Sequence, residues 1–306
     1  MLTDWVKPAV EQTLLPATSS SIGVAVVTGG SAGLGFGIAA ELIRADYRVA
    51  IIGRDAARVE IAAERLNERT RSTDRCLGLV GDVTDPASVR SCFERVEQTW
   101  GRLDVLVNCV GRSDRGRVES LTPERLAELI AANVTSTLLC SQAALASLCA
   151  SGGTVVNIGS LAGKIGSRYL GGYCAAKHAL SGLTQQMRLE WRDYGVHVAL
   201  VSPGPIRRED AGRRYAAEID GLPASAAQPA GGARLRGLAT ERVAAEVLSC
   251  IRRRHADRIL PRRVRLLLCL LQAFPACGDW LVLKFTGGSA TDDSAAGGPA
   301  KGKRGE

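Results

Sequence analysis

Six short runs of apolar residues, many of them β-branched, recur along the first two thirds of this 306-residue chain, with helical spacing between them. Each run is apolar nearly throughout, as strands buried on both faces are. The runs occupy residues 22–28, 48–53, 76–83, 103–109, 153–159 and 196–202. Strands alternating with helices predict an α/β fold, a doubly wound parallel sheet with helices on both faces.

The pattern also predicts how the chain is divided. Residues 22–260 form the main domain, and within it the irregular segment 206–236 has the length of a lid over a substrate site. Residues 1–21 are an N-terminal extension, 261–285 an amphipathic helical extension, and 286–306 a tail whose composition is typical of disorder.

Charge and cysteine usage exclude several classes of protein. The net charge is +8, and residues 252–265 supply six of these charges through seven arginines and one acid, Asp257. No aromatic residue interleaves those arginines, so we expect no nucleic-acid partner. The nine cysteines include no C-x-x-C pair, and with three scattered histidines they predict no metal site. The first twenty residues show no signal-peptide pattern, and we expect a cytoplasmic protein.

A glycine-rich turn, TGGSAGLG, follows the first run directly and opens a helical pattern. Gly29, Gly33 and Gly35 would let the backbone approach a pyrophosphate, whose charge the free N–H groups of the helix N-terminus would meet. A strand, such a turn and a helix in this order form the dinucleotide-binding unit of Rossmann-type sheets. A plain connecting loop is the alternative interpretation.

The end of the second run indicates which dinucleotide is bound. NAD-binding proteins usually carry an acid there, but this chain has Gly53 followed by Arg54, whose guanidinium could pair with the 2′-phosphate of NADP. The sequence therefore favours NADP(H). NAD(H) stays the alternative because Asp55 could accept from the ribose, unless it caps the next helix.

Further motifs downstream make a resemblance specific. The motifs are T-G-x-x-x-G-x-G at 28–35, Asp82 after the third run, N-C-V-G at 108–111, Asn133, Ser160, and Y-x-x-x-K at Tyr173 and Lys177. In their order and spacing over residues 22–205 the chain resembles the short-chain dehydrogenase/reductase family.

The spacing of Tyr173 and Lys177 has a chemical reason of its own. Residues i and i+4 share one face of a helix, so the ammonium would lie beside the phenol. A phenol normally titrates near 10, and a neighbouring positive charge favours the phenolate and lowers its pKa. Tyr173 could then give a proton in carbonyl reduction and take one in alcohol oxidation.

The resemblance implies the remaining roles. Ser160 would orient the substrate oxygen, Lys177 would also hold the nicotinamide ribose, and Asn133 would hold a water that relays protons. Asn108 is also expected to tie neighbouring strands together. The cofactor contacts implied by position are Thr28, Gly29, Ser31, Gly33, Leu34, Gly35, Arg54, Asp82, Val83, Asn108, Gly111, Tyr173, Lys177, Pro203, Gly204 and Ile206.

Two parts of the chain depart from the family pattern. A threonine expected shortly after Pro203 and Gly204 is absent, and Arg207 and Arg208 occupy that region, either facing an acidic substrate or forming a solvated lid face. The segment 262–285 has arginines leading into leucines, which suits peripheral contact with a membrane; docking on the domain or on another subunit is the alternative.

These observations predict an NADP-dependent oxidoreductase that moves a hydride between the nicotinamide and a carbonyl or secondary alcohol. The substrate would be an apolar, lipid-like small molecule, and the protein a homo-oligomer. The rival interpretation is a catalytically silent dinucleotide-binding sensor or scaffold.

Overall fold

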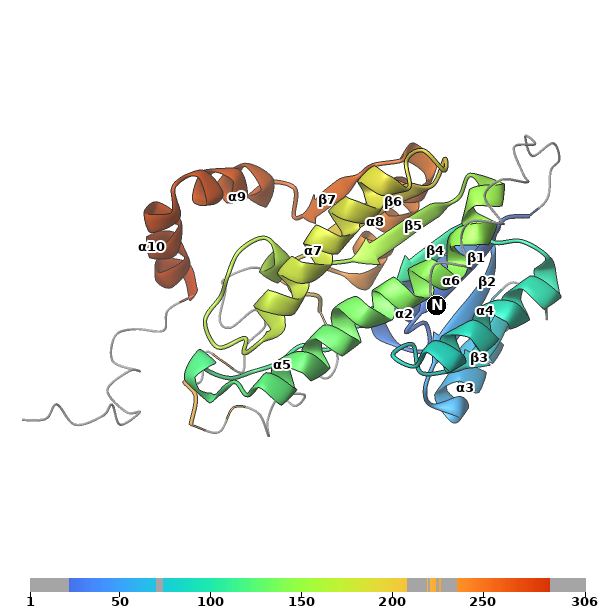
Figure 1. Ribbon diagram of the computed structural model, residues 1–306, viewed down its shortest axis with the longest axis horizontal. Helices are drawn as coiled ribbons and strands as arrows, with labels where there is room; N and C mark the ends of the chain where they lie inside the picture. Colours follow the sequence, from blue (N-terminus) through green and yellow to red (C-terminus); the bar gives the residue numbers. More distant parts are fainter. Residues whose placement is uncertain are drawn as a thin grey trace, which may run out of the picture.

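The computed structural model describes residues 22–69, 74–207, 219, 221–223, 226 and 236–286. Within these ranges seven parallel strands form one sheet in the order β3-β2-β1-β4-β5-β6-β7 (Figure 1). The order reverses between β1 and β4, which is where open α/β sheets bind ligands. The strands are β1 (Val24–Thr28), β2 (Arg48–Gly53), β3 (Cys76–Val80), β4 (Val105–Asn108), β5 (Thr154–Ile158), β6 (His197–Pro203) and β7 (Asp257–Leu260).

Helices cover both faces of the sheet and bury two separate apolar cores. Neighbouring residues of β2 show the alternation, since Ile51 packs in one core and Ile52 in the other. The first core receives α2 (Gly33–Arg44), α3 (Ala56–Glu68) and α8 (Thr240–Arg253). The second receives α4 (Pro86–Trp100), α6 (Ser136–Ser151) and α7 (Tyr173–Glu190). The doubly wound sheet predicted from the sequence is confirmed.

The seventh strand, β7, is the part of the sheet that the six apolar runs do not predict. It is four residues long and pairs with the end of β6, with Pro203 opposite Leu260. Of its four residues only Leu260 is buried, so it lacks the apolar run that identifies a central strand. Its last residue leads directly to the C-terminal helices.

One long helical segment crosses the sheet and changes its winding in the middle. It consists of α5 (Pro123–Ile130), the π-helical turn η2 (Ala131–Thr135) and α6, and Thr122 caps its start by accepting from the backbone N–H of Arg125 at 3.2 Å. Its length and composition would suffice to cross a membrane, but one side of α6 is buried in the second core through Cys140, Ala144 and Leu148. The segment therefore packs against the sheet along this side.

The C-terminal extension forms two helices where the sequence predicts a single amphipathic segment. They are α9 (Val264–Ala273) and α10 (Pro275–Thr286), and they stand at the end of the molecule opposite α3 (Figure 1). The chain turns at Phe274, whose φ of −128° is not helical, because helical geometry is disfavoured for a residue before proline. The predicted extension 1–21, the tail from 287 and most of the predicted lid 206–236 lie outside the described residues.

Candidate active site

The carboxyl ends of the central strands are tied together by buried amides. Asn108 of β4 donates through Nδ2 to Asn157 Oδ1 of β5 at 2.9 Å and to Ser141 of α6 at 3.0 Å. Asn157 in turn donates to Thr184 of α7 at 2.9 Å. The side chain of Asn108 thus has the strand-tying role expected for it, and both of its N–H groups are used inside the protein. Its side chain gives no support to the cofactor contact predicted at this position.

The glycine turn lies at the switch point and is built for close backbone approach. A Cβ at Gly35 would lie 2.1 Å from the carbonyl oxygen of Gly29, so the first turn of α2 packs directly on the loop. Gly29 and Gly33 have positive φ values of 67° and 54°, and Gly33 is exposed with no atom within 4 Å of its missing Cβ. Thr28 Oγ1 accepts from the backbone N–H groups of Cys109 and Val110 at 3.0 and 3.3 Å, which joins β1 to β4.

The end of β2 has no room for an acidic side chain. A Cβ at Gly53 would lie 2.9 Å from both Ser31 Oγ and a methyl group of Val59. Asp55 caps α3 and accepts from the backbone N–H of Arg58 at 3.1 Å, so the capping role considered for it is the one observed. Neither position therefore directs a carboxylate toward a ribose.

Arg54 is the charged residue that this end of β2 presents to solvent. Its side chain is 80% exposed, and Nη1 lies 3.9 Å from Asp82 Oδ2, beyond the end of β3. The pKa of Asp82 is lowered, mainly by the backbone N–H of Thr84 that it accepts from, and further by the Thr84 hydroxyl and Arg54. The guanidinium is thus held loosely beside the glycine turn and remains accessible.

Lys177 places a buried ammonium group beside Tyr173. It lies one turn after Tyr173, where α7 begins, and is only 4% exposed. Its ammonium donates to the carbonyl oxygen of Ile158 at 3.0 Å, at the end of β5, and stands 5.9 Å from the centroid of the Tyr173 ring. Burial lowers the pKa of Lys177 to about 8. At neutral pH the group is still mostly charged, and its charge is poorly screened.

The side chains of Asn133 and Lys177 both pack against Gly111. A Cβ at Gly111 would lie 2.7 Å from Asn133 Oδ1 and 3.2 Å from Lys177 Nζ, so both atoms face the same point. Asn133 Nδ2 donates to the carbonyl oxygens of Arg112 and Leu129 at 2.8 and 2.9 Å, and its buried Oδ1 has no partner among the described residues. An unpartnered acceptor beside an ammonium suits a bound water that passes protons. The π-helical turn around Asn133 is typical of functional sites.

Ser160 follows β5 by two residues and caps η3 (Leu161–Gly163). Its Oγ accepts from the backbone N–H of Ala162 at 3.1 Å, and the residue is half-buried. The hydroxyl of Ser181 on α7 bridges this turn to the helix, donating to the carbonyl oxygens of Gly163 and Lys177 at 3.1 and 3.0 Å. The serine loop and the helix carrying Tyr173 are therefore fixed to each other.

The other predicted cofactor residues occupy less exposed places. The side chains of Leu34 and Val83 belong to the two cores. Gly204 donates its N–H to the carbonyl oxygen of Leu260 at 2.8 Å, after Pro203 ends β6, and Ile206 forms a bridge with Leu238. These residues could contact a dinucleotide through their backbone atoms only. Together, the open glycine turn and the exposed Arg54 fit a bound dinucleotide.

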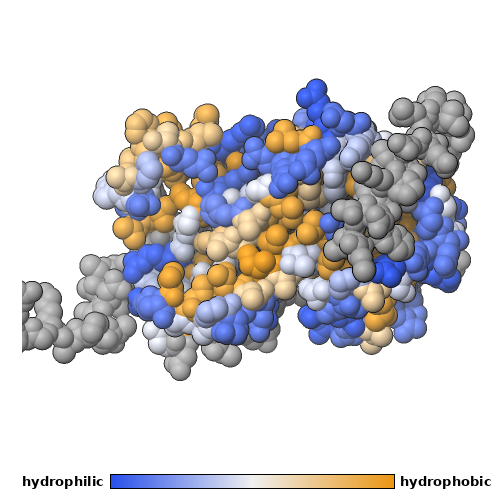
Figure 2. Space-filling model, in the orientation of Figure 1, coloured by the Kyte–Doolittle hydropathy of each residue, from blue (hydrophilic) through white to orange (hydrophobic). Residues whose placement is uncertain are grey.

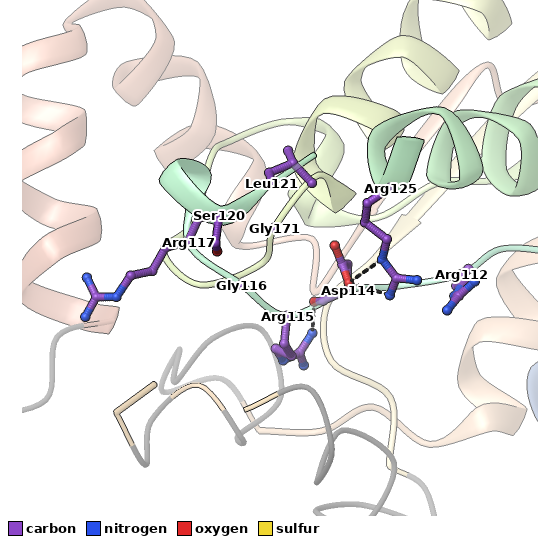
Figure 3. Close-up of a pocket in the computed structure, with 9 residues that line it drawn as sticks. All are labelled: Arg112, Asp114, Arg115, Gly116, Arg117, Ser120, Leu121, Arg125 and Gly171. Atoms are coloured by element: carbon purple, nitrogen blue, oxygen red, sulfur yellow. Dashed lines mark hydrogen bonds and ion pairs between the residues drawn. The ribbon is translucent and has the colours of Figure 1, made fainter. Parts of the chain in front are cut away.

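A pocket of about 410 Å³ that sequence reasoning missed lies between the segment after Gly111 and the residues before Tyr173 (Figure 3). Four arginines and one acid contribute to its lining, with Gly116, Ser120, Leu121 and Gly171; the charged residues are Arg112, Asp114, Arg115, Arg117 and Arg125. Figure 3 shows Asp114 facing Arg125, which it contacts at 2.7 Å. In the sequence, the run RSDRGR after the N-C-V-G motif is the feature that could have indicated this charged pocket.

Comparisons with known proteins identify the class. Residues 23–218 match the family model described as short chain dehydrogenase. The chain is 36% identical over 192 residues to 2-(S)-hydroxypropyl-CoM dehydrogenase 3 of Xanthobacter autotrophicus, covering 62% of this chain and 74% of that protein. It is 37% identical over 173 residues to a protein of the same bacterium named inactive 2-(S)-hydroxypropyl-CoM dehydrogenase 2, covering 56% and 73%.

A solved structure agrees with these relatives. A variant of the actinorhodin polyketide ketoreductase crystallised with NADPH superposes with a TM-score of 0.70 at 25% identity, over 80% of this chain and 97% of that one. The chain belongs to the short-chain dehydrogenase/reductase family. It is thereby assigned to the NAD(P)-dependent oxidoreductases that act on alcohol and carbonyl groups.

Two matched substitutions test the packing of the glycine turn. Gly35→Ala would place a methyl group against the Gly29 carbonyl, so we expect it to lower the melting temperature and abolish NADPH binding. Gly33→Ala meets open space and should cost only about 1 kcal/mol for its positive φ. Thermal unfolding gives the melting temperature of each variant, and fluorescence titration gives its affinity for NADPH. Equal melting temperatures for the two variants would contradict the packing described.

Burial of Lys177 predicts a dependence of stability on pH. Its pKa is about 8 in the folded protein, whereas an unfolded lysine titrates near 10.4. Between about pH 8 and about pH 10.4 the unfolded state binds more protons, so the free energy of unfolding rises with pH, by about 3 kcal/mol for this group.

Lys177→Met removes that contribution. Urea unfolding of both proteins across this range should give a difference in unfolding free energy that changes steadily with pH. A difference that stays constant over the range would show that the lysine is not desolvated.

Proposed function

We propose that this protein is an NADP(H)-dependent reductase or dehydrogenase acting on a carbonyl or secondary alcohol. The bound nicotinamide supplies or accepts the hydride. The observation that carries the proposal is the buried ammonium of Lys177 beside the Tyr173 ring, at the edge of the sheet where the glycine turn lies.

The four predicted catalytic residues take distinct roles in this proposal. Tyr173 exchanges a proton with the substrate oxygen, and Ser160 donates a hydrogen bond that orients that oxygen. Lys177 stabilises the phenolate of Tyr173 by its charge. Asn133 Oδ1 holds the water through which the proton reaches solvent. The fixed hydrogen bonds of Lys177 and Asn133 to backbone carbonyls support this, because they keep both groups in place without rearrangement.

Preference for NADP(H) over NAD(H) rests on the end of β2. Gly53 faces Ser31 at a distance that excludes a side chain, Asp55 is engaged as a helix cap, and Arg54 is accessible. A guanidinium recognises a phosphate through charge-assisted, two-point hydrogen bonds. The NADPH in the actinorhodin ketoreductase structure agrees with this preference.

The substrate proposed is an apolar, lipid-like carbonyl compound or alcohol. The arginine-lined pocket beside Tyr173 is held by its own ion pairs, because Arg125 contacts Asp114 and Glu128, and Arg112 also contacts Glu128 at 3.3 Å. We therefore propose that these arginines support the shape of the site and do not bind an acidic substrate.

A cytoplasmic location, a homo-oligomer and the domain limits stay predictions, and so does membrane contact through 262–285.

The rival function is a silent dinucleotide-binding sensor. It is favoured by the relative whose name describes it as inactive and which is 37% identical to this chain. Turnover separates the two functions. A protein that binds NADPH but oxidises it with no member of a broad carbonyl panel would be the sensor.

Tyr173→Phe tests the proton-donor role. With NADPH and a panel of ketones and aldehydes graded by chain length, we expect kcat to fall roughly 100-fold or more, while the Kd for NADPH is little changed. Tyr194→Phe, an exposed tyrosine beyond the end of the same helix, is the control and should keep full activity. Reduction retained by the Tyr173 variant would contradict the assignment.

Arg54→Gln tests the cofactor preference without requiring turnover. Loss of charge-assisted bonds to the 2′-phosphate should weaken NADPH binding roughly 10- to 100-fold and leave NADH binding unchanged. Titration of tryptophan fluorescence measures both constants. Arg58→Gln, an exposed arginine of α3 paired with Asp55, is the matched control. Equal weakening of both cofactors, or of neither, would exclude 2′-phosphate recognition by Arg54.

A further inference from the structure

Apolar side chains gather on the exposed side of the C-terminal helices. Of eleven large apolar residues exposed in the described part of the chain, six lie between 264 and 286. We call them the C-terminal face: Leu266, Leu267, Leu270, Phe274, Trp280 and Leu283. Figure 2 shows hydrophobic residues gathered over α9 and α10, at the upper left of the molecule. Leu266 is 78% exposed, and exposed apolar residues that gather in one patch mark an interaction site.

The opposite side of α9 is already docked on the domain. Leu268 and Leu271 are buried, and Gln272 donates to the carbonyl oxygen of Lys164 at 3.0 Å. The two helices cross closely, because a Cβ at Gly278 would lie 2.8 Å from the carbonyl oxygen of Leu271. Docking on the domain, one of the two alternatives considered from the sequence, is therefore observed for this side of α9. The C-terminal face is a second apolar stripe, which the described residues of the domain leave exposed.

Cationic residues border the C-terminal face. Residues 262–286 contain Arg262, Arg263, Arg265 and Lys284 against one acid, Asp279. The three arginines are exposed at the start of α9, and Lys284 stacks over the Trp280 ring at 4.8 Å. Guanidinium and ammonium groups around leucines and a tryptophan match the headgroup boundary of a bilayer with anionic lipids.

A second copy of the chain fits this surface less well. A two-fold contact would bring the same patch of both copies together. Residues 262–286 carry an excess of three positive charges, and although Arg262 is paired with Glu246, Arg263, Arg265 and Lys284 still outnumber the one acid, Asp279. Anionic headgroups would neutralise these charges, whereas a second copy would add to them. Charge complementarity thus favours a lipid surface.

The C-terminal face also lies at the catalytic edge of the sheet. The chain enters α9 from the carboxyl end of β7, and Gln272 binds the carbonyl of Lys164, four residues after Ser160. We propose that the C-terminal face docks on an anionic lipid bilayer and holds the active-site edge of the protein against the membrane surface.

The test measures binding of the full-length protein to vesicles of phosphatidylcholine, with and without phosphatidylglycerol, at low and high salt. Wild type should cosediment with the anionic vesicles and be released by salt. Arg263→Gln and Arg265→Gln should each weaken this binding roughly fivefold, and Leu266→Ser and Trp280→Ser roughly tenfold each.

Controls separate the surface from the fold. Ile61→Ser and Arg58→Gln alter exposed residues of α3, at the other end of the molecule, and should bind vesicles as wild type does. All variants should share the wild-type melting temperature and NADPH affinity, because the substituted side chains are exposed. Equal binding to both vesicle types, or a wild type that binds neither, would overturn the proposal. Leu266→Ser lowering the oligomeric mass in sedimentation, without vesicle binding by wild type, would assign the face to a second copy.

Discussion

The site depends on one buried ammonium group. Lys177 is almost fully enclosed and satisfies its charge on the carbonyl oxygen of Ile158, so it joins α7 to the end of β5. Burial makes this charge costly, and it also makes the charge act strongly on its neighbours. The ring of Tyr173 and the amide oxygen of Asn133 are the neighbours that the fold provides. A structural bond and a chemical role therefore coincide in one residue.

The surrounding fold keeps this arrangement rigid. The buried amides of Asn108 and Asn157 join two strands to two helices, and Thr28 ties β1 to β4 directly behind the glycine turn. Glycines then allow close approach: Gly111 lets Lys177 and Asn133 pack against the backbone, and Gly33 of the glycine turn faces open space. Side-chain hydrogen bonds thus fix the carboxyl ends of the strands, and the glycine turn above them leaves space for a ligand, at the edge where parallel sheets bind ligands.

Local patterns made much of this structure predictable. The six apolar runs and the i, i+4 spacing of Tyr173 and Lys177 are short-range features, and both were confirmed as strands and as one helical face. Features set by tertiary packing could not be predicted. The strand β7 has a single buried residue, the π-helical turn at Asn133 interrupts an otherwise ordinary helical pattern, and the arginine-lined pocket brings together segments more than forty residues apart. The docking of one side of α9 on the domain likewise depends on tertiary packing.

The central claim is that the buried ammonium makes the phenol of Tyr173 more acidic. The direct measurement is the pKa of Tyr173, followed by NMR of protein labelled with ¹³C in the tyrosine rings, in the wild type and in Lys177→Met. Because Lys177 is charged only below its pKa of about 8, the account predicts that Tyr173 in the wild type begins to ionise in that range, well below the usual value near 10, and that its pKa rises in the variant. The same pKa in both proteins would contradict it.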